Sequence, residues 1–386
     1  MNFKRVLFLI MIAVLTVMAS SNLLAQDKKS KMNKSVYKFE TVYGLDYTQV
    51  KNQQRTGTCW SFASTSFIES ELLRMGKGDF DLAEMYFVRH TYTNKATEYF
   101  RRHGLGNFSE GGQAHDVLNV IRDHGFVPEE VYGGNCYKGE VHNHSEMVAM
   151  VKGMLDGVLK NRRKGITTVW MDAVNACFDI YLGENPDTFE FRDKTYSPVA
   201  FAHRELNFNV DDYVELSSFT HHPFYKAFNL EVPDNWSNDY YYNLPLDELM
   251  KVMYSAIKNG YSICWDGDVS EAGFSHKNGV AIIPADDEKD NMFKDIVDEK
   301  EVSAELRQQM FDQLISTDDH LMHLVGISQD QNGKKYFITK NSWDKDSNDF
   351  GGLLNMSDTY IQLKTIAILV HKDAIPLDIA RKLNLK

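Results

Sequence analysis

The chain contains few cysteines, which limits what disulfides can contribute to its stability. Only four occur among 386 residues, whereas small secreted domains that depend on disulfides are rich in cysteine. A chain of this length buries enough apolar surface to fold without crosslinks. If Cys59 serves as a nucleophile, as argued below, Cys136, Cys177 and Cys264 remain, and this odd set permits at most one internal disulfide. We expect none.

Positive charge is also scarce. The sequence has 42 Lys and Arg against 54 Asp and Glu, which gives a formal net charge of −12. Proteins that bind nucleic acid need clustered Lys and Arg to neutralise phosphates, so we expect no nucleic-acid partner. An acidic protein is instead suited to peptides with a cationic N-terminus.

Long apolar runs are rare, and the one at the N-terminus is short. Residues 6–18 form a predominantly apolar run of about 13 residues, less than the ~20 that a membrane-spanning helix needs. Two basic residues precede this run and small residues follow it up to Ala25, the pattern of a cleaved secretory signal. We therefore expect residues 1–25 to be a signal peptide and residues 26–35 a flexible linker. The protein would then be exported, to the periplasm or outside the cell, with no stable membrane anchor.

The residues that follow Cys59 have the periodicity of a helix. Apolar residues recur at helical spacing, and a glycine then marks the end: Ala63, Phe67, Ile68, Leu72, Met75 and Gly76. Cys59 would therefore lie at a helix N-terminus, where unpaired backbone N–H groups and the helix dipole favour a thiolate. The side-chain amide of Gln53 and the backbone N–H of Cys59 could together form an oxyanion hole. On this segment alone, a buried structural cysteine is the alternative.

Partners for Cys59 are found far along the chain. Residues 318–327 and 336–339 are predicted as two strands joined by a turn. Such a hairpin brings His320 beside Asn341. His320 would act as the base and ion-pair partner of Cys59, while the Asn341 side-chain oxygen would fix the tautomer of its ring.

Neighbours of this predicted base are informative too. Trp343 would cover the hydrogen bond between the imidazole and the amide and keep water away. Asp318 and Asp319 precede the base directly. We expect these acidic groups to raise the pKa of the imidazole and to favour the charged ion pair.

Four residues thus occur in the order found in papain-like cysteine peptidases, namely Gln53, Cys59, His320 and Asn341. The Cys-Trp pair and the Asn-Ser-Trp segment that ends at Trp343 are also similar to signatures of that superfamily. Within it, the chain resembles the bleomycin hydrolase and aminopeptidase C family. An Asn-Gln pair precedes Gly-x-Cys-Trp, and residues 109–113, Ser-Glu-Gly-Gly-Gln, are similar to the family's glycine loop. The resemblance covers roughly residues 36–375.

The resemblance implies an α+β fold of the papain-like, two-lobed type. A helical lobe would span residues 36–140 and a strand-rich, antiparallel, barrel-like lobe residues 256–375. A helical insertion would occupy residues 141–255, and residues 376–386 would form a C-terminal tail. Asp344 stands where the family usually has glycine, which leaves the local turn open.

The resemblance also implies a cysteine-type peptidase, with aminopeptidase activity favoured. Cys59 would attack the peptide bond and form an acyl-enzyme, and His320 would act as general acid and base. Gly111, Gly112 and Trp343 would bind the peptide substrate, and family members often form hexamers, so a homo-oligomer is expected. Because the C-terminal arm is short, an endopeptidase or acyl transferase with an open cleft is the alternative. A non-catalytic relative would have lost one of the catalytic groups.

No metal ion and no cofactor are expected. The sequence offers two groups of candidate zinc ligands, His320 and His323 with His221 and His222, or His142 with His144 and Cys136. None of these groups has the spacing of a known zinc site.

Overall fold

The computed structural model describes residues 36–136, 141–161 and 165–385. The predicted signal peptide, residues 1–25, and the predicted linker, residues 26–35, lie outside this part of the chain. Among the described residues, no helix is long and apolar enough to cross a membrane. The four cysteines are all described, and all are free.

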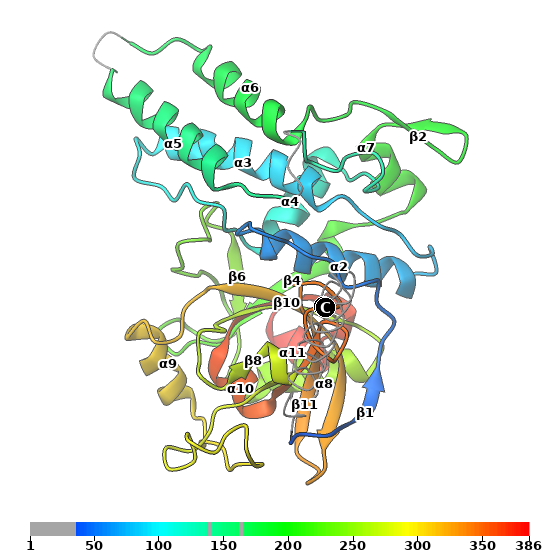
Figure 1. The fold of residues 1–386 in the computed structure, drawn as a ribbon, viewed down its shortest axis with the longest axis vertical. Coiled ribbons are helices and arrows are strands. Elements are labelled where there is room, and N and C mark those ends of the chain that lie inside the picture. The colour runs from blue at the N-terminus through cyan, green and yellow to red at the C-terminus, as the bar shows by residue number, and fades with distance from the viewer. Residues whose placement is uncertain (1–35, 137–140, 162–164, 386) are drawn as a thin grey trace, which may run out of the picture. The chain divides into compact units, whose positions relative to one another are not determined.

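Five helices share one apolar core. They are α2 (Cys59–Arg74), α3 (Glu84–Arg101), α4 (Ala114–His124), α5 (Ser145–Lys160) and α6 (Trp170–Leu182). Helices α3, α5 and α6 pack against one another (Figure 1). Helix α2 is buried along most of its length, because α3 and α4 cover one side and strand β10 (His320–Asp330) covers another.

Eleven strands of the described chain form one mixed sheet. Its order is β5-β6-β4-β13-β7-β10-β11-β12-β9-β8, and β1 pairs separately with β10. The strands not yet given bounds are β1 (Phe39–Gly44), β4 (Tyr213–Ser217), β5 (Ala227–Asn229), β6 (Tyr240–Asn243), β7 (Ile263–Gly267), β8 (Phe274–Ser275), β9 (Val280–Ala281), β11 (Lys335–Lys340), β12 (Leu353–Ser357) and β13 (Thr365–His371). Only the β4–β6 and β9–β12 pairs are parallel. This combination of a helical core with a largely antiparallel sheet confirms the predicted α+β class.

A second apolar core lies between the sheet and three further helices. These are α8 (Leu246–Lys258), α10 (Asp358–Lys364) and α11 (Leu377–Lys382), whose buried residues pack with those of the central strands. The remaining helices and strands are α7 (Pro198–Ala200), α9 (Ala304–Asp312) and the hairpin of β2 (Phe189–Phe191) with β3 (Lys194–Tyr196).

The prediction that residues 141–255 form a helical insertion is only partly right. Helices α5 and α6 fill its beginning, but β4, β5 and β6 join the main sheet. Strand β4 is buried along its whole length because it pairs with β13 on one edge and β6 on the other. The predicted boundary at residue 256 falls inside α8. Residues 213–258 therefore belong to the strand-rich part of the molecule.

Residues 376–386 are likewise not a free tail where they are described. Helix α11 is anchored by Ile379, Ala380 and Leu383, which are buried in the second core. Ion pairs of Lys251 with Asp378, and of Lys382 with Glu248, link α11 to α8.

Candidate active site

Cys59 is the first residue of α2, as the sequence predicts. The turn before it is held by Glu110, whose carboxylate accepts a hydrogen bond from the Gly57 N–H at 2.7 Å. The indole N–H of Trp60 donates to the Glu110 carbonyl oxygen at 3.0 Å. A Cβ at Gly57 would lie 2.9 Å from the Cβ of Glu110, so glycine lets the two segments approach. These contacts fix Cys59 beside the glycine loop.

His320 and Asn341 come together at the end of the β10–β11 hairpin. His320 Nε2 lies 2.8 Å from Asn341 Oδ1, which also accepts the Ser342 backbone N–H at 2.8 Å. Because Oδ1 is an acceptor, Nε2 must carry the proton, and this leaves Nδ1 of the neutral ring as the base. The Trp343 ring lies 5.0 Å from the His320 ring and covers this hydrogen bond.

The hairpin also contacts the nucleophile directly. The backbone N–H of Leu321, which follows His320, hydrogen-bonds to the Cys59 thiol. Cys59, at the start of α2, therefore lies at the start of β10, the strand whose first residue is His320. Cys59 is 9% exposed and His320 is 4% exposed, so little solvent reaches either group.

Gln53 lies next to the segment that carries Asn341, because its side chain is hydrogen-bonded to Ser342. Its Nε2 donates to the Thr56 carbonyl oxygen at 2.8 Å, and its Oε1 accepts from the Ser342 hydroxyl at 2.7 Å. An amide nitrogen has two hydrogens, so one is available for an oxyanion formed next to Cys59.

Burial governs the protonation of the catalytic pair. Removal from water raises the pKa of the Cys59 thiol to about 12, and nearby carboxylates add to this effect. Removal from water also lowers the pKa of His320 to about 4, against the opposing effect of its hydrogen bond to Asn341. The substrate-free site therefore favours a neutral thiol and a neutral imidazole. Burial therefore acts against the predicted resting ion pair.

The expectation that Asp318 and Asp319 raise the pKa of His320 is wrong. Asp318 Oδ2 accepts from Gln113 Nε2 at 2.6 Å, and Asp319 Oδ1 accepts from the Val269 backbone N–H at 2.9 Å. Neither carboxylate is among the groups that set the pKa of His320.

The two glycines predicted to bind substrate lie against tightly packed side chains. A Cβ at Gly111 would lie 1.9 Å from Asp234 Oδ2, and a Cβ at Gly112 would lie 2.7 Å from Asp116 Oδ2. The Gly111 carbonyl oxygen accepts a hydrogen bond from Lys95 Nζ. For Gly112, the described residues supply no hydrogen-bond partner to the backbone N–H or C=O, and these groups face no competition for an extended peptide.

Asp344 resolves the turn that the sequence leaves open. Its φ is 80°, in the left-handed region, where glycine costs least and Asp is one of the better-tolerated side chains. Its Oδ1 accepts from the Asp346 backbone N–H at 2.9 Å. Asp344 thus adopts a backbone conformation that glycine adopts without strain.

Sequence reasoning missed His276 as a neighbour of the site. His276 Nδ1 lies 3.4 Å from Asn341 Nδ2, and its ring lies 5.0 Å from that of Trp343. Its position depends on the short strands β8 and β9, which have no clear pattern in the sequence. Glu110 was also missed as the residue that holds the Gly57 turn, although it lies within the recognised glycine loop.

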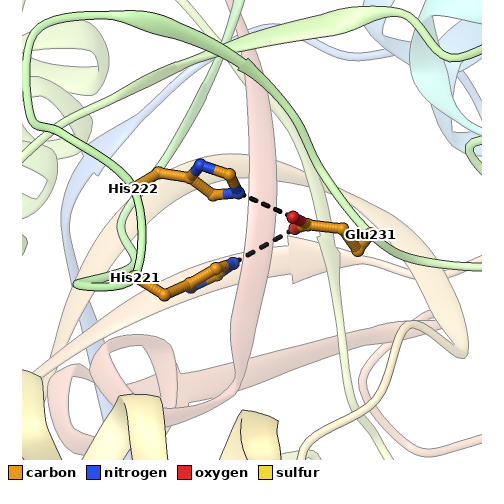
Figure 2. Close-up of side chains that lie close together, drawn as sticks. All are labelled: His221, His222 and Glu231. Carbon is orange, nitrogen blue, oxygen red and sulfur yellow. Dashed lines mark hydrogen bonds and ion pairs between the residues drawn. The ribbon is translucent and has the colours of Figure 1, made fainter.

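Figure 2 shows the group of described residues whose geometry could hold a metal ion, His221, His222 and Glu231. The Nε2 atoms of the two rings lie 3.1 and 2.7 Å from the two oxygens of Glu231. His221 Nδ1 faces Gln308 Oε1 at 3.2 Å, and this oxygen also accepts the Thr220 backbone N–H at 2.6 Å. Hydrogen bonds of His221 to Gln308 and Glu231, and of His222 to Glu231, therefore account for the arrangement without a metal.

Comparison with known proteins finds a peptidase family and relatives named as aminopeptidases and bleomycin hydrolase. The family model described as the Peptidase C1-like family matches residues 105–386. The chain is 24% identical to aminopeptidase W of Lactobacillus delbrueckii subsp. lactis, over 87% of this chain and 83% of that protein. It is 24% identical to aminopeptidase C of Listeria monocytogenes, again over 87% and 83%. It is 21% identical to bleomycin hydrolase of Mus musculus, over 88% of this chain and 84% of that protein.

A solved structure shares the fold. The crystal structure of PepW from Lactobacillus rhamnosis superimposes with a TM-score of 0.71 at 19% sequence identity. The similarity covers 90% of this chain and 85% of that chain. The two-lobed architecture expected from the sequence is thus found in an experimental structure.

Proposed function

Because the chain belongs to the Peptidase C1-like family, we propose that it is a cysteine peptidase that acts as an aminopeptidase. The observation that carries this proposal is the tautomer of His320. Asn341 holds the proton on Nε2, so the other ring nitrogen is free to accept the proton of Cys59. Relatives named aminopeptidase and bleomycin hydrolase support the choice of reaction.

The proposed reaction follows from these groups. His320 takes the thiol proton as Cys59 attacks the carbonyl carbon of the first peptide bond. The resulting oxyanion accepts hydrogen bonds from the Cys59 backbone N–H and the free amide hydrogen of Gln53. His320 then returns the proton to the leaving amine, and water attacks the thioester to release the amino acid. No metal or cofactor enters any of these steps.

The experiment uses an alanyl aminomethylcoumarin amide and its N-acetyl counterpart. The protein tested comprises residues 26–386, and we expect it to hydrolyse the free-amine substrate. We expect Cys59→Ala to be inactive but to have the same melting temperature as the wild type. Iodoacetamide should inactivate the wild-type enzyme by labelling Cys59 stoichiometrically. Equal or faster cleavage of the acetylated substrate would instead indicate an endopeptidase, and no reaction with either substrate, together with no labelling, would reject peptidase chemistry.

We also propose that the protein is exported through its N-terminal segment. The support is the short apolar run and the small residues that end at Ala25. N-terminal sequencing of the protein from the periplasm or the culture medium should begin at Gln26. Retention of residues 1–25 would contradict the proposal.

A homo-oligomer is proposed on the family resemblance alone. Light scattering of the purified protein gives the mass directly. A mass near six times that of one chain would support a hexamer, and the mass of one chain would reject any oligomer.

A further inference from the structure

Three carboxyl groups converge near the nucleophile without a role in the proposed chemistry. They belong to Asp234, Asp266 and Asp318, and each acts on the charge of Cys59. Asp266 lies in β7, directly opposite Leu321 of β10. Asp318 precedes β10, and Asp234 lies between β5 and β6. Segments far apart in sequence thus place negative charge at one side of the thiol.

Asp266 has another acid as its polar partner, since its side chain is hydrogen-bonded to that of Asp318. It is 3% exposed, and apart from Asp318 no described residue bonds to either of its carboxyl oxygens. Its neighbour Asp318 also carries a carboxyl group, and burial together with that charge raises the pKa of Asp266 well above its usual value. An acceptor buried without a donor is costly unless a cation or a donor is added.

Other polar groups nearby are already engaged. Gln113 Nε2 donates to Asp318 at 2.6 Å, and His115 Nδ1 pairs with Glu215 at 2.8 Å. The nearby cation Lys95 donates to the Gly111 carbonyl oxygen. In the described structure none of these three donors is bonded to Asp266, whose polar partner is the carboxyl group of Asp318.

Asp234 marks where a bound peptide would have to end. Its Oδ1 accepts from Asn107 Nδ2 at 2.7 Å and lies 3.4 Å from the Ser109 hydroxyl, which holds the carboxylate over Gly111. The space beside Gly111 is filled, since a Cβ there would overlap Asp234 Oδ2. A peptide laid along Gly112 as an added strand would meet this carboxylate at its N-terminal end.

We infer that Asp234, Asp266 and Asp318 form the subsite that binds the α-ammonium group of the substrate's N-terminal residue. This inference rests on the proposed peptidase function. An ammonium group has three donors and no acceptor, so it supplies the donor that the Asp266–Asp318 pair lacks and a positive charge among the three acidic groups. An acetylated amine carries no charge and adds bulk where Asp234 closes the space, so it is excluded. The subsite thereby restricts the enzyme to free N-termini.

A shared proton is the simplest alternative for the Asp266–Asp318 pair. Two adjacent carboxyl groups can hold one proton between them, in which case the pair is structural. A lysine or arginine side chain of the substrate is a second alternative, because it brings the same positive charge. The experiment must separate both from the α-ammonium group.

The test compares three amides of aminomethylcoumarin, made from alanine, N-acetylalanine and lactic acid. Lactic acid has a hydroxyl group in place of the ammonium group and nearly the same shape. We expect the wild type to prefer the alanyl over the lactoyl amide by about a hundredfold in kcat/KM, and Asp318→Asn and Asp234→Asn to reduce this preference at least tenfold, mainly through the KM of the alanyl amide. Asp211→Asn, on the exposed surface, is the matched control and should keep the wild-type ratio.

Folding and chemistry are checked separately. Each variant must retain the wild-type melting temperature within a few degrees, and peptide mapping must find the iodoacetamide label on Cys59, because Cys136 is also free and is exposed. Asp234→Asn, on a half-buried loop, serves if Asp318→Asn does not fold. A folded, reactive variant that keeps the full preference would overturn the inference and leave the pair structural. The inference would also be overturned if the wild type cleaved the N-acetyllysyl amide faster than the N-acetylalanyl amide and Asp318→Asn lost this difference. If no substrate is cleaved and Cys59 is not labelled, the proposed function itself fails.

Discussion

Gln53→Ala tests the oxyanion hole most directly. One amide hydrogen of Gln53 binds the Thr56 carbonyl oxygen, and the other is free for the oxyanion. Removal of one oxyanion donor typically costs about 2.7–4 kcal/mol of transition-state stabilisation, which is about 10²–10³-fold in rate. We therefore expect kcat/KM for the alanyl amide to fall by that factor.

The same substitution also removes structural contacts. Gln53 is buried and makes side-chain hydrogen bonds to Thr56 and Ser342. At about 1 kcal/mol each, their loss should lower the free energy of unfolding by about 2 kcal/mol. Ser342→Ala is the matched control, because it removes one of these bonds and keeps the donor. It should lose about 1 kcal/mol of stability and less than about tenfold in kcat/KM.

Alkylation by iodoacetamide separates the two effects. This reaction displaces iodide and forms no oxyanion, so Gln53→Ala should label Cys59 at nearly the wild-type rate. If hydrolysis and alkylation fall in parallel, Gln53 acts by positioning Cys59 and not as an oxyanion donor. If hydrolysis in the folded variant stays within about tenfold of wild type, the assignment of the oxyanion hole is wrong.

Three further outcomes are expected. Asn341→Ala removes the acceptor that fixes the His320 tautomer. Its kcat should fall by about tenfold or more, with little change in KM. An unchanged kcat would show that another group fixes the tautomer. At Asp344, where φ is 80°, substitution by glycine or asparagine should leave the free energy of unfolding within about 1 kcal/mol of the wild-type value. Substitution by valine should lower it by about 2 kcal/mol. Equal melting curves for the three variants would contradict the argument from backbone strain. Dialysis against a chelator should leave hydrolysis unchanged, because thiol and imidazole carry out every proposed step; lasting inactivation that zinc reverses would refute that mechanism.

Local patterns explain what the sequence could predict. The helix after Cys59 and the hairpin from His320 to Asn341 were predicted because apolar spacing and a short turn determine each within a few residues. The observed bounds of α2, β10 and β11 differ from the predicted ones by few positions. The hairpin turn places His320 and Asn341 together, and Trp343, two residues after Asn341, covers their hydrogen bond.

Distant pairing explains what the sequence could not predict. Strands β4, β5 and β6 are three to five residues long, and β4 pairs with β13 more than a hundred positions away. Such short segments lack a period that distinguishes strand from loop. The burial of Asp266 could not be predicted from the sequence, because it depends on α2 and β10, which pack against β7.

The protonation of Cys59 was also beyond the sequence, because it depends on burial and on distant charges. The helix N-terminus favours a thiolate, but desolvation and the carboxylates of Asp318, Asp234 and Asp266 oppose it. If these carboxylates bind the substrate ammonium group, binding cancels their charge and lowers the pKa of Cys59. The nucleophile would then be activated by the substrates that the enzyme is meant to cleave.

The pH dependence of Cys59 alkylation tests this coupling without a substrate. Asp318 has its pKa raised to about 7, chiefly by burial, so its charge opposes the thiolate only above that pH. Asp318→Asn should therefore alkylate faster than wild type above about pH 7, with its rate profile displaced to lower pH by about one pH unit, and the two profiles should converge in acid. Asp211→Asn, whose side chain is 74% exposed and paired with Arg122, should follow the wild type throughout. Coincident profiles for Asp318→Asn and wild type would mean that this carboxylate does not act on the thiol, and activation by the substrate amine would lose its physical basis.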